Sequence, residues 1–308
     1  MKCACSTRWR TGPGSRRNPS KAVQGGVELS YAQGLSALGY LCAKGLAESV
    51  VIGNEQKRVL RKVGQDYLVW ALEHATNITA VSQDGLDRAR LLCNRPDVGR
   101  VILNSIDPRD FADGVEDLPL SRPVIGSLAV FRNKKGLEVL LAAFHMILQR
   151  YPTAHLLLVG YVLDTEQQIF NALVTKYDLA GKFTLTGRIA RRDALRYLRV
   201  MDVFAFSSLH DGCPNAVLEA MLAGLPIAAS RAGALPQMIE HGKEGLLARP
   251  GSATELCEAM MQILSGEPLS RKFGQRAKER ALTYFAPQRE LDEYMQVYRD
   301  CLVTHRNY

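Results

Sequence analysis

Residues 203–229 read VFAFSSLHDGCPNAVLEAMLAGLPIAA and contain a strand, a loop, a helix and a second strand in succession. The apolar run Val203–Ser207 predicts a buried strand, and a short polar loop follows it. Residues 215–223 have the apolar spacing of a helix, and Pro226–Ala229 predicts the next strand. Both strands are continuous apolar runs rather than alternating ones, which is typical of parallel strands covered by helices on both faces.

The same alternation extends through much of the chain. Further strands are predicted at Pro123–Leu128, His155–Gly160, Phe183–Thr186 and Gly245–Ala248. Helices are predicted at 136–150, 164–178, 191–201, 233–241 and 252–265, and two more near 269–284 and 288–302. This order predicts an α/β fold with a doubly wound, Rossmann-like parallel sheet. Ligands of such sheets bind beyond the carboxyl ends of the strands.

Composition excludes several classes of protein. The chain has 308 residues, of which 47% are hydrophobic and 23% charged, so it is neither disordered nor a coiled coil. No apolar run approaches the roughly 20 residues of a membrane-spanning helix, and the start lacks the apolar core of a signal peptide. The chain has seven cysteines, an odd number, and they are widely spaced apart from the close pair Cys3 and Cys5, which favours reduced thiols in the cytoplasm.

The charge is concentrated at the start of the chain. Six of the eight net positive charges fall in residues 1–27, which contain no acidic residue. A basic segment of this kind could bind nucleic acid or an anionic lipid surface. A solvated, disordered tail over residues 1–26 is the simpler interpretation, so no nucleic-acid partner is expected.

The start of the 215–223 helix carries the first chemical signal. Pro214 is expected at the first helical position, where its missing N–H costs nothing. The backbone amides of Asn215, Ala216 and Val217 would then be unpaired donors, and with the positive end of the helix dipole they predict an anion site. Gly212 would let the backbone approach a ligand closely.

Two carboxylates flank this helix start. Glu219 lies one turn after Asn215 on the same helical face, where it could accept hydrogen bonds from two adjacent ribose hydroxyls. Asp211 could do the same for a sugar beyond the phosphates. A capped amphipathic helix with a surface glutamate explains the same spacing, and the spacing alone leaves both interpretations open.

The surrounding sequence resembles a known family. The run DGCPNAVLEAMLAGLPIAAS is similar to the E-G-x-P-N-x-x-L-E-A-M-A-x-G-x-P-V-V-A-T run of GT-B glycosyltransferases of the group 1, or family 4, type. The similarity continues through RAGALPQMIEHGKEGLLARPGSATELCEAM. Upstream it includes VIGSLAVFRNKKGLEVLLAAF, HLLLVG and FTLTGRIARRDALRYLRVMDVFAFSS. It covers about Ile78 to Leu302, and it implies the GT-B fold.

The resemblance implies roles for the residues around the helix start. Glu219 would bind the ribose of the donor nucleotide, and Asp211 would contact the transferred sugar. The family has Glu at the latter position, and Asp is one methylene shorter. Donors to the sugar and diphosphate would come from Gly212, Cys213, Asn215, Ala216 and Val217.

Other loops would complete the donor site. Lys135 matches the family lysine on the diphosphate. Ser127 stands where the family often has Arg, and Arg132 in the same loop could substitute for that Arg, although an exposed basic loop explains RNKK equally. The turn Gly187–Arg188–Ile189 would hold the base. The resemblance implies a retaining, metal-independent reaction with no cofactor and no metal site, the donor being a UDP- or GDP-sugar.

The first part of the chain fits the family less well. ITAVSQDGLDRARLL and VILNSIDPRDF resemble the end of the family's first domain, in which Asn104 and Asp107 match. Residues before Ile78 leave room for only about half of the expected domain. The resulting division is 1–26 basic tail, 27–120 partial acceptor-side domain, 121–285 donor-binding domain and 286–308 a helix returning to the first domain. An incomplete sheet exposes apolar surface, which a protein partner could cover.

These observations favour a retaining glycosyltransferase of polysaccharide or glycolipid assembly, with a glycan or lipid-linked acceptor. It is expected in the cytoplasm, with peripheral contact at the inner face of the membrane. A catalytically impaired nucleotide-sugar-binding remnant, or a partner-dependent subunit, is the alternative. An epimerase of the same fold on UDP-sugars is disfavoured by the DGCPN run.

Overall fold

The computed structural model describes residues 68–110 and 119–306. The expected tail, residues 1–26, and the following residues up to 67 lie outside the described residues. The chain divides into two compact units, Met1–Ile78 with Arg88–Val98 and Thr79–Asp87 with Gly99–Tyr308. The four domain boundaries stated above remain predictions.

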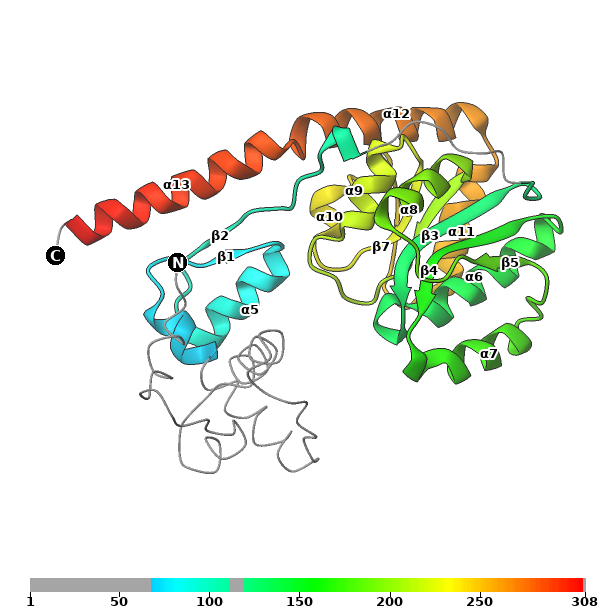
Figure 1. Ribbon diagram of the computed structural model, residues 1–308, viewed down its shortest axis with the longest axis horizontal. Coiled ribbons are helices and arrows are strands. Elements are labelled where there is room, and N and C mark those ends of the chain that lie inside the picture. Colours follow the sequence, from blue (N-terminus) through cyan, green and yellow to red (C-terminus); the bar gives the residue numbers. More distant parts are fainter. Residues whose placement is uncertain (1–67, 111–118, 307–308) are drawn as a thin grey trace, which may run out of the picture. The chain divides into compact units, whose positions relative to one another are not determined.

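The larger unit is built on a six-stranded sheet with the order β5-β4-β3-β6-β7-β8 (Figure 1). All of its paired strands are parallel, which confirms the predicted doubly wound parallel sheet. The strands are β3 (Val124–Phe131), β4 (His155–Val162), β5 (Phe183–Leu185), β6 (Val203–Phe206), β7 (Ile227–Ser230) and β8 (Gly245–Ala248).

Strand β3 is longer than its sequence predicts. It continues past Leu128 to Phe131 because it pairs with β4 residue for residue, from Val124 opposite His155 to Phe131 opposite Val162. The polar and basic loop that follows therefore starts at Arg132.

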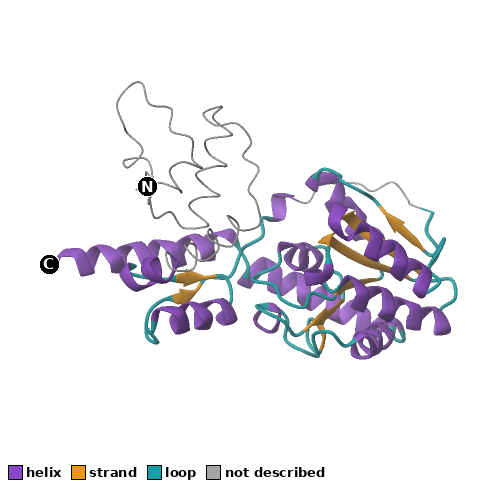
Figure 2. Ribbon diagram, turned by 90° about the horizontal axis from the view of Figure 1, so that it is seen from below, coloured by secondary structure: helices purple, strands orange, loops and turns teal. Residues whose placement is uncertain are grey.

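Helices cover both faces of the sheet (Figure 2). One hydrophobic cluster contains side chains of α6 (Leu137–Arg150), α7 (Gln167–Lys176) and α11 (Ala253–Leu264). The other contains side chains of α8 (Arg191–Tyr197), α9 (Asn215–Leu222) and α10 (Leu235–Met238). The helices α12 (Glu267–Tyr284) and α13 (Pro287–Arg306) follow. Short 3-10 turns complete the unit: η1 (Pro108–Asp110), η2 (Asn133–Lys135), η3 (Asp164–Glu166) and η4 (Leu198–Val200).

The alternation of β4 explains the continuous apolar strands. Leu156 and Leu158 belong to one hydrophobic cluster, whereas Leu157 and Val159 belong to the other. All four are at most 1% exposed. Successive side chains of a strand point to opposite faces, so a strand buried on both faces needs apolar residues throughout.

The strand order locates the expected ligand site. From β3 the chain builds outward through β4 to β5, then crosses back to β6 and builds outward the other way through β7 to β8. The connections diverge at the carboxyl ends of β3 and β6, which is the switch point where open α/β sheets bind ligands.

A small parallel pair precedes this sheet. Strand β1 (Thr79–Ala80) pairs with β2 (Arg100–Val101), and α5 (Gln83–Cys93) lies between them in sequence. The Gly85 amide donates to the Ser82 hydroxyl oxygen at 3.1 Å, which is an N-terminal helix cap. This βαβ connection fits the expected end of a first Rossmann-like domain.

In the described part of the other unit, residues 68–74 are helical. Arg95 closes the end of this helix, because its Nη1 donates to the carbonyls of Leu72 and Ala75 at 2.9 and 2.7 Å.

Candidate active site

The loops after β3 and β6 are joined by direct hydrogen bonds at the switch point. The Leu209 amide donates to the Lys134 carbonyl at 3.0 Å. The Ser207 hydroxyl lies 2.9 Å from the carbonyl oxygens of both Lys135 and Gly136. The basic loop and the DGCPN loop, about 75 residues apart in sequence, therefore form one structure.

Gly136 makes this close approach feasible. Its φ is +66°, and a Cβ at this position would lie 1.9 Å from the Ser207 carbonyl oxygen. Only glycine fits such a contact without moving the backbone.

Lys135 and Asp211 form an ion pair at this junction. Their side chains are 20% and 17% exposed, so the pair is only partly screened by water. The Ser208 hydroxyl, which is fully buried, lies 3.4 Å from the same carboxylate oxygen of Asp211. The lysine predicted for the diphosphate and the acid predicted for the sugar are thus side by side.

Helix α9 begins at Asn215, as predicted, but Pro214 is not part of its first turn. Pro214 is its N-cap, in an extended conformation, and Asn215 is its first residue. The Val217 amide donates to the Pro214 carbonyl at 3.0 Å, so the expectation that it is unpaired is wrong. The cause is a tight first turn, in which a bond of three-residue span replaces the four-residue one. The amides of Asn215 and Ala216 precede this bond, at a helix start that is exposed at Asn215 and half-buried at Ala216.

Asn104 contacts this helix start from the segment after β2. Its side-chain Nδ2 donates to the Cys213 carbonyl at 2.8 Å and to the Asn215 Oδ1 at 2.9 Å. No local sequence signal indicates this contact, which spans about 110 residues.

Glu219 is buried rather than on the surface. It is 4% exposed, and its Oε1 accepts a hydrogen bond from the Arg191 Nε at 2.9 Å. The Arg191 side chain, at the start of α8, is 54% exposed. A buried carboxylate needs charged or hydrogen-bonding partners, and Arg191 is one that the sequence did not suggest.

Cys213 turns its side chain into the core. The residue is 7% exposed, and its Sγ lies 3.7 Å from the Met238 sulfur. Burial raises the pKa of the Cys213 thiol to about 11.

Gly212 and Gly233 join the DGCPN loop to the loop after β7. The Ala234 amide donates to the Gly212 carbonyl at 2.9 Å. Gly233 has φ +55°, and a Cβ there would lie 1.5 Å from the Asp211 carbonyl oxygen. The backbone that carries Asp211 is therefore held from both neighbouring loops.

The remaining predicted residues follow β3 and β5. Ser127 is 3% exposed within β3, four residues before the strand ends, and not in the loop with Lys135. Arg132 is half-buried at the start of that loop, and its Nε is buried without a hydrogen-bond partner among the described residues. After β5, Gly187 has φ +75° and Arg188 lies over the Tyr161 ring at 3.6 Å from its centroid. Ile189 packs against the α9 side of the core.

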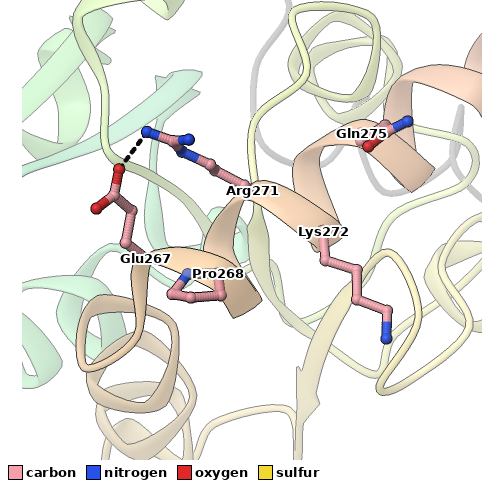
Figure 3. Close-up of a pocket in the computed structure, with 5 residues that line it drawn as sticks. All are labelled: Glu267, Pro268, Arg271, Lys272 and Gln275. Carbon is pink, nitrogen blue, oxygen red and sulfur yellow. Dashed lines mark hydrogen bonds and ion pairs between the residues drawn. The ribbon is translucent and has the colours of Figure 1, made fainter.

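A surface depression elsewhere takes no part in this arrangement. Figure 3 shows that its lining comes from α12 alone, and an ion pair joins Glu267 to Arg271 across it. The other lining residues are Pro268, Lys272 and Gln275. No strand end contributes to it.

Two kinds of feature are absent from the described residues. Within 68–110 and 119–306, no three His, Cys, Asp or Glu side chains are grouped so as to hold a metal ion. No helix in those ranges combines the length and apolar character that crossing a bilayer requires.

Several known proteins are similar to this chain in sequence. N-acetyl-alpha-D-glucosaminyl L-malate synthase of Bacillus anthracis is 25% identical over 245 residues, which are 77% of this chain and 63% of that protein. The amylovoran biosynthesis glycosyltransferase AmsK of Erwinia amylovora is 32% identical over 169 residues, covering 53% of this chain and 41% of that protein. The chain thus spans about half of the length of these relatives.

The structure resembles that of HepE from Anabaena in complex with UDP and glucose. The TM-score is 0.67 at 22% identity, over 78% of this chain and 67% of that one, and this likeness supports a GT-B-type fold. The sequence profile of the glycosyl transferases of group 1 matches residues 108–280, more than half of the chain. The chain therefore belongs to the group 1 glycosyl transferases.

Proposed function

We propose that this chain is a glycosyltransferase of family 4 type that moves a sugar from a UDP- or GDP-sugar to a glycan or lipid-linked acceptor. The family match over residues 108–280 carries this proposal, because that range contains every residue assigned to the donor below. The geometry at the switch point supports it, since the basic loop, the acids and the helix start lie together there.

The donor is bound in three parts. Glu219 accepts hydrogen bonds from the ribose hydroxyls, and the backbone of the turn Gly187–Arg188–Ile189 holds the base. Lys135 and the first amides of α9 hold the diphosphate. Arg132 joins them: a buried guanidinium nitrogen without a partner is costly, and a phosphate oxygen would satisfy it.

Asp211 and Lys135 face the reacting bond. Asp211 holds hydroxyls of the transferred sugar. As the bond between the anomeric carbon and the diphosphate oxygen breaks, its electron pair passes to that oxygen, and Lys135 with the α9 amides stabilises the growing charge. The acceptor oxygen forms the new bond to the anomeric carbon and gives its proton to the departing phosphate. By resemblance to family 4 the reaction retains configuration and needs no metal.

The kind of acceptor determines where in the cell the protein is expected and what it contacts there. A lipid-linked or growing glycan would bring the protein to the cytoplasmic face of a membrane, by peripheral contact. A protein partner covering the acceptor-side part of the chain belongs to the same proposal.

Nucleotide-sugar binding without turnover is the second candidate. One observation favours it: every residue assigned to the site holds the donor, and none of them is assigned to the acceptor.

Calorimetry and product analysis test both candidates. The chain is titrated with UDP and GDP, and then incubated with UDP- and GDP-sugars, with and without glycan and lipid-linked acceptors. We expect binding of one nucleotide that falls at least about tenfold in Glu219→Ala, since a hydrogen bond to a charged group contributes about 1.5–3 kcal/mol. Equal binding by both forms would contradict the ribose assignment, and tight binding without product would favour the second candidate.

A further inference from the structure

The side chain of Asn104 is fixed by the groups it contacts. Its Nδ2 lies 2.8 Å from the Cys213 carbonyl oxygen and 2.9 Å from the Asn215 Oδ1. A backbone carbonyl can only accept, so the end of the Asn104 amide that faces Cys213 must be the NH₂ end. The positions of the oxygen and the nitrogen in the Asn104 side-chain amide are therefore fixed by its hydrogen-bond partner, although the two flipped orientations have nearly the same shape.

This orientation determines that of Asn215. The Asn104 nitrogen carries two N–H groups and accepts nothing, so the second N–H must meet an oxygen. Asn215 thus turns its Oδ1 toward Asn104 and its own NH₂ group away. Because Asn215 is the exposed first residue of α9, this places two further N–H donors at the helix start.

The segment that carries Asn104 is itself held in place. Leu103 and Ile106 are buried, with 5% and 4% exposure. The Ile106 amide donates to the Phe285 carbonyl at 2.9 Å, and the Ser105 amide donates to the Glu290 carboxylate at 3.0 Å. A side chain mounted on so constrained a segment can hold its partner in one orientation.

We propose that Asn104 is a positioning residue that makes Asn215 a hydrogen-bond donor to the diphosphate of the nucleotide sugar. The inference rests on the proposed function and extends it. With the Asn215 amide reversed, an oxygen would face the phosphates and repel them. Asn104 therefore sets the affinity for the charged part of the donor, and leaves the affinity for the nucleoside part unchanged.

The test compares each nucleotide with its nucleoside. Asn104→Leu has nearly the same shape, no charge and no hydrogen-bonding group. Binding of UDP and GDP is measured by calorimetry, and binding of uridine and guanosine by NMR titration. For the nucleotide that binds, we expect the affinity to fall about tenfold, the effect of one hydrogen bond to a charged group. The affinity for its nucleoside should change less than about twofold.

A double-mutant cycle separates positioning from general damage. In a chain that already carries Asn215→Leu, adding Asn104→Leu should lower the nucleotide affinity by less than about a further twofold, because the side-chain NH₂ group that Asn104 orients is already absent. Full additivity, or equal losses for nucleotide and nucleoside, would overturn the proposal.

If Asn104→Leu fails to fold, the exposed residue Asn215 still allows a decisive test. Asn215→Leu alone must then lower the affinity for the nucleotide and not that for the nucleoside, and the Asn215 side-chain NH₂ resonances of the wild-type chain must shift when the nucleotide binds. Unaffected binding or unshifted resonances would refute the proposal. A wild-type chain that binds neither UDP nor GDP would refute the proposed function itself, whereas normal binding by both variants would refute only the roles of the Asn104 and Asn215 side chains.

Discussion

At the scale of single residues, Glu219 offers a test of what its carboxylate recognises. If it binds the ribose, Glu219→Gln should lose most of the discrimination between the nucleotide and its 2′-deoxy analogue, because the analogue lacks the hydroxyl and the variant lacks the charge. We expect the wild-type chain to prefer the ribonucleotide about tenfold and Glu219→Gln to prefer it less than about threefold. Competition calorimetry measures both ratios.

The matched control is Glu267→Gln, on the exposed surface of α12. Because Glu267 lines the depression of Figure 3, this control also tests whether that depression takes part in nucleotide binding. Its preference should equal that of the wild-type chain. A Glu219→Gln chain that keeps the full preference would show that the carboxylate does not read the hydroxyl.

Cys213 gives a prediction about pH. Its folded-state pKa, about 11, lies above the ordinary value of 9.0 because burial disfavours the thiolate. The buried thiol therefore stabilises the fold fully below about pH 9, and this contribution is lost as the pH rises toward 11. The difference in unfolding free energy between the wild-type chain and Cys213→Ala should shrink from pH 8 to pH 10.5 in urea titrations. A difference that stays constant or grows would contradict the burial of this thiol.

At the scale of elements, the contact between the loops after β3 and β6 depends on Gly136. Gly136→Ala adds a Cβ at 1.9 Å from the Ser207 carbonyl oxygen, in addition to the strain of a positive φ. Gly181→Ala is the matched control, because Gly181 has a similar φ of +71° and open space around its Cβ position. We expect Gly181→Ala to lower the unfolding free energy by about 1 kcal/mol. Gly136→Ala should lower it by about 1–3 kcal/mol more, from overpacking.

Urea unfolding measures both variants, and calorimetry with UDP or GDP should show weaker binding for Gly136→Ala alone, since Lys135 is its neighbour. Equal destabilisation of the two variants would mean that the two loops can separate without cost.

The strands and the helices around them were predictable because the signal for each lies in its own short stretch of sequence. Continuous apolar runs identified six strands, and helical spacing identified the helices between them. The errors have local causes: β3 runs on to Phe131 because its partner is long, and the tight first turn of α9 moves Pro214 to the cap. The contacts of Asn104 with Asn215 and of Arg191 with Glu219 were not predictable, because each joins residues that only the folded sheet brings together.

At the scale of the whole molecule, hydrogen bonds join α13 to the segment 103–106, which lies about 185 residues earlier in the chain. The Arg289 Nη2 donates to the Leu103 carbonyl at 2.6 Å, and the Glu290 carboxylate accepts from the Ser105 amide at 3.0 Å. The same segment carries Asn104, so a helix close to the end of the chain helps to mount a residue of the candidate site. Stability and donor binding should therefore respond together when these hydrogen bonds are weakened.

Arg289→Ala tests this coupling. Its side chain is 19% exposed and bonds to two carbonyls of the segment, Leu103 and Asn104, so its loss should lower the unfolding free energy by about 1–3 kcal/mol. Nucleotide affinity should fall about threefold or more, because Asn104 is then less firmly held. Arg271→Ala, on an 80% exposed side chain of α12, should change the unfolding free energy by no more than about 0.5 kcal/mol and leave binding intact. If Arg289→Ala lost stability and kept the full nucleotide affinity, α13 would brace the fold without reaching the site, because the position of Asn104 would not depend on it.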